Sequence, residues 1–231
     1  TLLEESLCKW FAKKIGFNDS SGGIAASGGT LSNLNALIAA RNNAGLGSNP
    51  NSVLLISEDA HSSFIKCIRV MGLDAANLVR IKTDNQGRMD INNLRKSLNK
   101  CLIENKKIFA IVATLGTTVR GAIDPIKEIS EICKERNIWL HIDGSIGGIF
   151  ALSSIQIEGL NNINQANSIT INPQKIIGIT KTSSLLLVAN MNTLQKTFST
   201  GLPYISSKED IVNRGEIGIQ GSRPAEVIKL W

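Results

Sequence analysis

Apolar residues recur along the chain at two spacings, and these predict two kinds of element. Leu3, Leu7, Phe11 and Ile15 repeat every three or four positions, which is the spacing of one helix face, and Gly16 follows as the helix end. The same spacing predicts further helices over residues 31–45, 61–72, 91–104 and from Pro125 onward.

Short runs of aliphatic and β-branched residues lie between these helices and predict strands. They cover residues 52–57, 77–82, 108–114, 138–143, 168–172 and 183–190. Strands that alternate with helices indicate an α/β fold with a largely parallel sheet. Segment 21–30 is too rich in glycine for a helix, and Asp124 is a natural cap for the helix that Pro125 begins. With no repeat and no linker, residues 1–231 are expected to form one domain.

Composition argues against several classes of function. Hydrophobic residues make up 42% of the chain and charged residues 19%, which is typical of a globular domain. The net charge of +6 comes from scattered lysines and arginines without a basic block, which argues against nucleic-acid binding. No apolar stretch approaches the roughly 20 residues that span a membrane, and no leader sequence opens the chain. We therefore expect no nucleic-acid or membrane partner.

The cysteines and the two ends of the chain suggest its setting. Four cysteines lie far apart and only two histidines occur, so no ordinary zinc-ligand spacing is visible. This pattern favours a reducing, cytoplasmic location. The chain opens within a helix at Thr1, and residues 224–231 look like the start of another helix, so we expect it to be a piece of a longer protein.

Polar residues follow several predicted strands, at the edge where α/β sheets bind ligands. Asp143 ends an apolar strand, where a carboxylate needs a partner, although a helix cap or an ion pair would satisfy it equally well. His61 and Thr118 also follow strands, and each could serve an ordinary cap or turn. These alternatives stay open for each residue taken alone.

The sequence Ser27-Gly-Gly-Thr30 stands at the start of a predicted helix. Free backbone N–H groups and the positive end of the helix dipole make such a place suitable for phosphate. The chain contains no GxxxxGK[ST] motif, and no GxGxxG follows a strand, which argues against a P-loop and a dinucleotide-binding fold.

Two lysines, Lys175 and Lys181, lie in the mostly apolar segment 168–188. A lysine held at a strand end in apolar surroundings suits an amine-reactive carbonyl cofactor, because burial makes the amine nucleophilic. Pyridoxal phosphate also needs an acid beside its ring nitrogen and an anchor for its phosphate. Lys175, Asp143 and the glycine-threonine helix start would supply all three. Lys181 is expected to be exposed at a turn.

Five motifs in one order give these residues a context: SGGTxxNxxALxAAR, AHSS, VATLGTT followed by GAIDPIKEI, IWLHID and NPQK. In this order the chain resembles the large domain of the group II pyridoxal-phosphate-dependent amino acid decarboxylases, which include the aromatic amino acid, glutamate and diaminobutyrate decarboxylases. The resemblance implies a fold-type I architecture, with a mixed, mainly parallel sheet of seven strands flanked by helices. It also implies a homodimer that acts on an amino acid.

The resemblance also implies a role for each site residue. Lys175 would hold pyridoxal phosphate as an aldimine, Asp143 would keep the ring nitrogen protonated, and His61 would stack on the ring and take part in proton transfer. The phosphate and ring contacts would come from Gly29, Thr30, Thr118, Ser145, Asn172 and Gln174. His141, two residues before Asp143 on the same strand face, is our own candidate for orienting that carboxylate.

The chain departs from the family pattern at two motifs. Gln174 replaces the usual histidine before the lysine, so that position can form hydrogen bonds but carry no proton charge. Ser145 and Ile146 replace an alanine and a tyrosine, which changes the cofactor face and removes an aromatic wall. By comparison with the family we expect these 231 residues to lack its N-terminal segment and its C-terminal small domain, and Tyr204 is a candidate for its catalytic tyrosine.

Three functions are consistent with these residues. The leading hypothesis is decarboxylation of an L-amino acid to an amine and CO₂. The second is another carbon–carbon lyase of the same fold and cofactor, because fold alone does not fix the reaction. The third is an inactive fragment or pseudoenzyme, which the departures and the missing segments favour.

Overall fold

The computed structural model describes residues 2–154, 157, 159–201 and 213–231. They build one seven-stranded sheet in the order β1-β7-β6-β5-β4-β2-β3, in which β7 runs antiparallel to both neighbours and the other pairs are parallel. The strands are β1 (Gly22–Ala26), β2 (Ser52–Ser57), β3 (Leu78–Ile81), β4 (Lys107–Thr114), β5 (Trp139–Gly144), β6 (Ser168–Ile171) and β7 (Ser184–Val188). The predicted mixed, mainly parallel sheet is confirmed.

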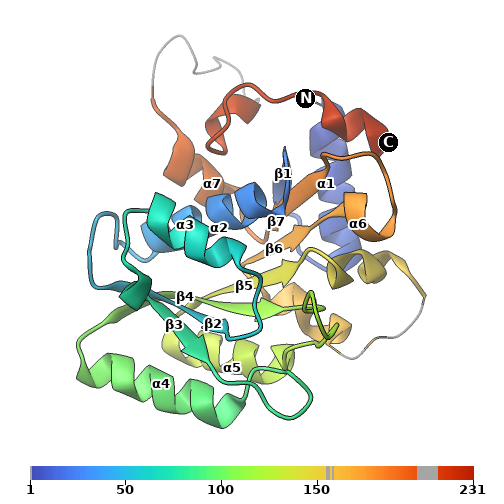
Figure 1. The fold of residues 1–231 in the computed structure, drawn as a ribbon. Coiled ribbons are helices and arrows are strands. Elements are labelled where there is room, and N and C mark those ends of the chain that lie inside the picture. The colour runs from blue at the N-terminus through green and yellow to red at the C-terminus, as the bar shows by residue number, and fades with distance from the viewer. Residues whose placement is uncertain (1, 155–156, 158, 202–212) are drawn as a thin grey trace.

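Helices cover both faces of this sheet (Figure 1). The α-helices are α1 (Leu2–Ile15), α2 (Gly29–Asn43), α3 (Ser63–Val70), α4 (Ile91–Ile103), α5 (Ile126–Arg136), α6 (Pro173–Ile176) and α7 (Met191–Phe198). Short 3-10 helices are η1 (Ala75–Asn77), η2 (Gly147–Leu152), η3 (Leu160–Gln165), η4 (Arg214–Glu216) and η5 (Glu226–Lys229). The helices predicted from apolar spacing form at the expected places. Within the described ranges, no helix is both long enough and apolar enough to cross a membrane.

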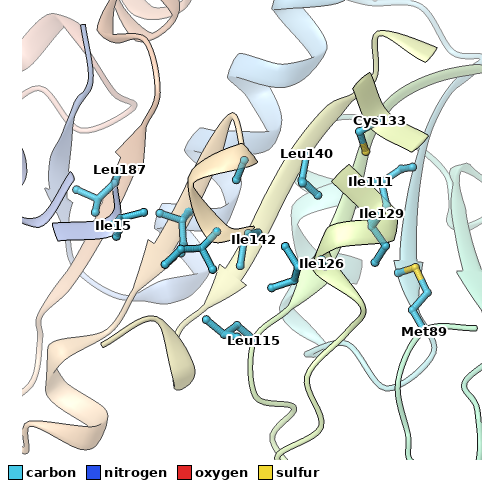
Figure 2. Packing of buried hydrophobic residues seen from close by; sticks show 14 of the residues in the cluster. Ile15, Met89, Ile111, Leu115, Ile126, Ile129, Cys133, Leu140, Ile142 and Leu187 are labelled. Atoms are coloured by element: carbon cyan, nitrogen blue, oxygen red, sulfur yellow. The ribbon is translucent and has the colours of Figure 1, made fainter. Parts of the chain in front are cut away.

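The core lies in two layers, one on each side of the sheet. On one side, α1, α4 and α5 pack their apolar faces against the strands, and Figure 2 shows Ile15 of α1 and Ile126 and Ile129 of α5 on this side. On the other side, α2, α3 and α7 cover the sheet. Leu140 and Ile142 of β5 are fully buried in the first layer, while Trp139 belongs to the second. The alternation along β5 thus sends neighbouring side chains to opposite layers.

Strand β1 was not predicted, because its sequence GGIAA lacks an apolar run. It forms by pairing along β7, where Gly23 lies opposite Leu187. A Cβ at Gly23 would collide with the carbonyl oxygen of Leu186, so glycine permits this close approach. The strand therefore depends on a partner that is distant in sequence.

The predicted capping role of Asp124 is wrong. Pro125 is the cap residue of α5, and the Asp124 carboxylate instead accepts hydrogen bonds from the backbone N–H groups of Met89 and Thr114, both at 2.7 Å. Burial raises the pKa of Asp124 to about 6, although these two bonds oppose the shift. The side chain thus joins the end of β4 to the turn before α4.

Candidate functional site

A cavity of about 540 Å³ lies at the carboxyl edge of the parallel strands. Its walls come from segments that follow five strands, β1, β2, β4, β5 and β6, which is the edge where open α/β sheets bind ligands. All nine predicted site residues line it: Gly29, Thr30, His61, Thr118, Asp143, Ser145, Asn172, Gln174 and Lys175. Residues up to 146 positions apart in sequence are therefore gathered at one place.

The N-terminus of α2 forms one wall of the cavity. Gly28 precedes this helix and has no side chain to cap the first N–H groups, so the helix presents amide donors and its positive dipole end. A Cβ at Gly29 would lie 2.6 Å from Asn172 Nδ2 and 3.1 Å from Ser145 Oγ. Glycine thus lets the polar side chains of Asn172 and Ser145 pack against the start of α2, beside its free N–H groups, and this arrangement suits a phosphate.

Asp143 forms the base of the cavity at the end of β5. Its carboxylate is buried, and both oxygens accept hydrogen bonds: Oδ1 from the backbone N–H of Ser145 at 3.1 Å and Oδ2 from Asn33 Nδ2 at 3.2 Å. Two donors on two oxygens hold the plane of the carboxylate. An acid in this position can pair with a protonated ring nitrogen of a ligand.

Lys175 stands at the cavity rim in the short helix α6, which begins with Pro173 directly after β6. Its side chain is exposed, and its backbone N–H donates to the carbonyl of Asn172 at 2.9 Å. Gln174 Oε1 accepts the backbone N–H of Ser183 at 2.7 Å, which closes the loop between α6 and β7. Lys181 is exposed within that loop, as predicted, and is not among the described residues that line the cavity.

His61 also lines the cavity and lies just before α3. Its Nδ1 accepts the backbone N–H of Ser63 at 3.2 Å, so the neutral ring carries its proton on Nε2. The cap residue of α3 is Ser62, so His61 is not the cap itself, although it accepts the first helical N–H and also lines the cavity. Thr118 also lines it, whereas Thr117 Oγ1 serves its own turn by accepting the N–H of Ala122 at 3.0 Å.

Sequence reasoning missed several polar residues of the cavity wall. Ser63 Oγ and Thr114 Oγ1 are buried there without a hydrogen-bond partner among the described residues. Asn33 also lines the cavity, from within α2. An asparagine on the apolar side of a helix is unusual, and that position could have drawn attention to it. Tyr204, the predicted catalytic tyrosine, lies outside the described residues.

His141 contacts Asp143 only indirectly. It is fully buried, and its Nε2 lies 3.1 Å from Asn33 Oδ1, while the other end of that amide reaches Asp143. Burial lowers the pKa of His141 to about 4, against the opposing effect of the Asp143 charge. Asn33 is thus the link between the two residues that the sequence suggested as partners.

The residues present fit pyridoxal phosphate. The cavity has the volume of a small-molecule site, and its amine, carboxylate and helix N-terminus match the aldehyde, ring nitrogen and phosphate of that cofactor. The uncapped start of α2 and the unpaired hydroxyls of Ser63 and Thr114 leave donors for a ligand.

Known proteins are similar to this chain in both sequence and fold. The chain is 33% identical over 233 residues to an aromatic-L-amino-acid decarboxylase of Bacillus atrophaeus, covering 99% of this chain and 48% of the relative. The crystal structure of mouse CSAD matches with a TM-score of 0.92 at 30% identity, over 100% of this chain and 50% of that one. The structure of 4-hydroxyphenylacetaldehyde synthase from Rhodiola rosea matches with a TM-score of 0.88 at 26% identity, over 100% and 50%. The chain spans about half the length of the curated relatives it matches.

The match to a protein family extends from the first residue to the last. Residues 1–231 correspond to the family described as the pyridoxal-dependent decarboxylase conserved domain. Together with the fold and the cavity, this shows that the chain belongs to the pyridoxal-dependent decarboxylase family.

Proposed function

We propose that this chain binds pyridoxal phosphate through a covalent bond to Lys175, and that the protein to which it belongs converts an L-amino acid to an amine and CO₂. The observation that carries the proposal is the meeting of Lys175, Asp143 and the N-terminus of α2 around one cavity. When bound, the cofactor supplies an electron-accepting ring for the electron pair that remains when the carboxyl group leaves.

The residues that line the cavity then have distinct roles in binding and catalysis. The amide donors of Gly29 and Thr30 and the side chain of Asn172 bind the phosphate, and Asp143 pairs with the protonated ring nitrogen. His61, whose Nδ1 is taken up by Ser63, would contact the ring and keep its Nε2–H available as a proton donor. These tasks need only residues that already lie at the cavity.

The remaining contacts adapt the site to this sequence. Gln174 uses Oε1 to hold Ser183, which leaves its two Nε2–H donors for the phosphate side of the cavity. Ser145 and Thr118 add hydroxyl contacts to the cofactor, and Ile146 gives an aliphatic wall.

We also infer that the intact protein is a cytoplasmic homodimer. The four cysteines are free and buried, which supports a reducing compartment. Lys175 is exposed at the rim of its cavity, and a second subunit would exclude water from it. Sedimentation of the intact protein tests whether it is a dimer, and a monomer that is fully active would contradict the proposal.

The cofactor proposal is tested by labelling. Pyridoxal phosphate is added to the purified chain, visible absorbance is followed, and the product is reduced with borohydride and mapped by peptide mass. We expect the label on Lys175, its loss in Lys175→Ala and its persistence in the matched variant Lys181→Ala. Label spread over surface lysines, with no absorbance band, would contradict the proposal and favour an inactive fragment.

A second reaction of the same site is aldehyde formation, and one relative favours it. The structure from Rhodiola rosea that shares this fold is an aldehyde synthase. Product analysis of the intact protein separates the two. Simple decarboxylation yields an amine and CO₂, whereas the second reaction also consumes O₂ and water and yields an aldehyde, CO₂, ammonia and H₂O₂. The aliphatic Ile146 is the first position to substitute if aldehyde appears.

A further inference from the structure

Behind the cavity, five buried side chains form a continuous row of hydrogen bonds. Trp139 Nε1 lies 2.8 Å from Ser168 Oγ, and Ser168 Oγ lies 2.8 Å from His141 Nδ1. His141 Nε2 lies 3.1 Å from Asn33 Oδ1, and Asn33 Nδ2 lies 3.2 Å from Asp143 Oδ2. Each of the five side chains is less than a tenth exposed. The row therefore runs through the protein interior and ends at the cavity.

Strand geometry explains why these residues line up. Trp139, His141 and Asp143 alternate along β5, so they share the face that α2 covers. Ser168 of β6 lies directly beside His141 in the parallel register. Asn33 approaches from α2 and inserts between His141 and Asp143. The row thus joins two strands and a helix.

The chemistry of the two ends determines the direction of every bond. Trp139 can only donate, and the Asp143 carboxylate can only accept. Asn33 must therefore turn Nδ2 towards Asp143 and its carbonyl oxygen towards His141. A carbonyl oxygen needs a donor, so the proton of the imidazole lies on Nε2. Ser168 then accepts from Trp139 and donates to the bare Nδ1 of His141.

The other protonation states of His141 are unfavourable here. A proton on Nδ1 would leave two lone pairs facing each other at 3.1 Å, between Nε2 and Asn33 Oδ1. A doubly protonated ring would place a charge in a fully buried position, and burial lowers the pKa of His141 to about 4. One neutral tautomer satisfies every donor and acceptor in the row.

We propose that Asn33 and His141 are positioning residues, which hold the Asp143 carboxylate for the ring nitrogen of the cofactor through one directed row of hydrogen bonds. The inference rests on the proposed function for its purpose. The row itself exists without the cofactor, because all its members belong to this chain. Ser145 N–H holds one oxygen of Asp143, and the row holds the other.

The tautomer can be measured directly in the chain without cofactor. The chain has only two histidines, so ring-¹⁵N histidine labelling gives two imidazole spectra, and His61→Gln removes one to assign them. We expect His141 to show a protonated Nε2 and a bare Nδ1 at neutral pH. A protonated Nδ1, or a mixture of tautomers, would overturn the directed row. This measurement succeeds or fails independently of pyridoxal phosphate binding.

The positioning role is tested with Asn33→Asp. This side chain still accepts from His141 Nε2, but it cannot donate to Asp143 and places a second carboxylate beside it. We expect the His141 tautomer to remain and the affinity for pyridoxal phosphate to fall by about tenfold to a hundredfold.

The matched control is Asn35→Asp, which changes a buried asparagine of the same helix that bonds to Leu31 and Ile219 instead. It should bind pyridoxal phosphate as the unchanged chain does. Equal affinity in the two folded variants would overturn the positioning role. If Asn33→Asp does not fold, Asn33→Ser replaces it: the same loss of affinity is expected, and unchanged affinity overturns the role. If the unchanged chain itself does not bind, the proposed function fails, while the imidazole spectrum still decides the row.

Discussion

At Gly29, a single hydrogen atom stands where every other residue would place a carbon. The added Cβ of Gly29→Ala would lie 2.6 Å from Asn172 Nδ2. Asn172 cannot readily move aside, since its Oδ1 accepts the Ser184 hydroxyl at 2.6 Å and Ser184 in turn contacts Ser32. We expect this change to weaken pyridoxal phosphate binding by about tenfold or more, as the collision costs roughly 1–3 kcal/mol. Absorbance titration measures it.

Gly47→Ala is the matched control for that titration. Nothing lies within 4 Å of the Cβ that this change adds, and Gly47 does not line the cavity. Its cofactor affinity should be unchanged. If Gly29→Ala binds as tightly as Gly47→Ala, the N-terminus of α2 is not the phosphate site.

Sequence alone identified the residues of the cavity whose chemistry is distinctive. Lys175 and Asp143 stand out because a charged group next to an apolar strand needs an explanation. Asn33 does not, because its importance depends on the two groups that α2 brings it between. Ser63 and Thr114 are similar cases: a hydroxyl becomes informative only when it is found buried and unpaired. The assigned roles remain predictions until the labelling and titration are done.

Among the elements, α1 is joined to the opposite end of the described chain by one buried carboxylate. Glu4 accepts the N–H of Ala25 at 2.8 Å and forms ion pairs with Arg214 at 3.3 Å and Arg223 at 3.1 Å. Burial alone would raise the pKa of Glu4, but Arg214, the Ala25 N–H and Arg223 together lower it. This cluster therefore holds α1, β1 and η4 together.

We expect Glu4→Gln to lower the free energy of unfolding by about 3–5 kcal/mol, because it leaves two largely buried guanidinium groups without a counter-charge. Urea unfolding at neutral pH measures the loss. The adjacent change Glu5→Gln breaks an exposed pair with Lys9 and removes a weaker attraction to Arg214, and it should cost no more than about 1 kcal/mol. Similar losses in both variants would show that the cluster adds little to stability.

The elements that sequence predicted well are those with their own periodicity. The helix over residues 31–45 and the strand over residues 108–114 correspond closely to α2 and β4. Strand β1 was missed because its two glycines and two alanines carry no pattern, and only β7 defines it. Asp124 was misassigned because the cap geometry near Pro125 looked sufficient, whereas the backbone donors of Met89 and Thr114 are not visible in sequence.

For the whole molecule, two buried groups change the free energy of unfolding in opposite directions as the pH is lowered. His141 has a pKa of about 4 when folded, against an ordinary value of 6.5, so the unfolded chain binds the proton first and stability falls as pH drops from 6.5 towards 4. Asp124 has a pKa of about 6 when folded, against 3.8, so the folded chain binds the proton first and stability rises as pH drops from 6 towards 3.8. Each effect amounts to about 3 kcal/mol.

Two variants separate these effects. Asp124→Asn removes the gain in stability that Asp124 gives on acidification. The difference in the free energy of unfolding between this variant and the unchanged chain should therefore grow by about 3 kcal/mol as the pH drops from 6.5 to 4, in addition to any loss that does not depend on pH. His141→Gln should show the opposite trend over the same range. Urea unfolding at several pH values measures both differences, in which the other titrating groups cancel. Parallel pH curves for either variant and the unchanged chain would contradict the corresponding shift.

The position of β1 has a consequence for the order in which the protein takes shape during synthesis. Among the described residues, this first strand pairs only with β7, which lies more than 150 residues later. A ribosome that makes about 5–20 residues per second leaves β1 without its partner for many seconds. Gly29 follows β1 closely in sequence, so the two belong to the same early segment of the chain. The growing chain therefore brings Gly29 and Lys175 together only near the end of translation of this region.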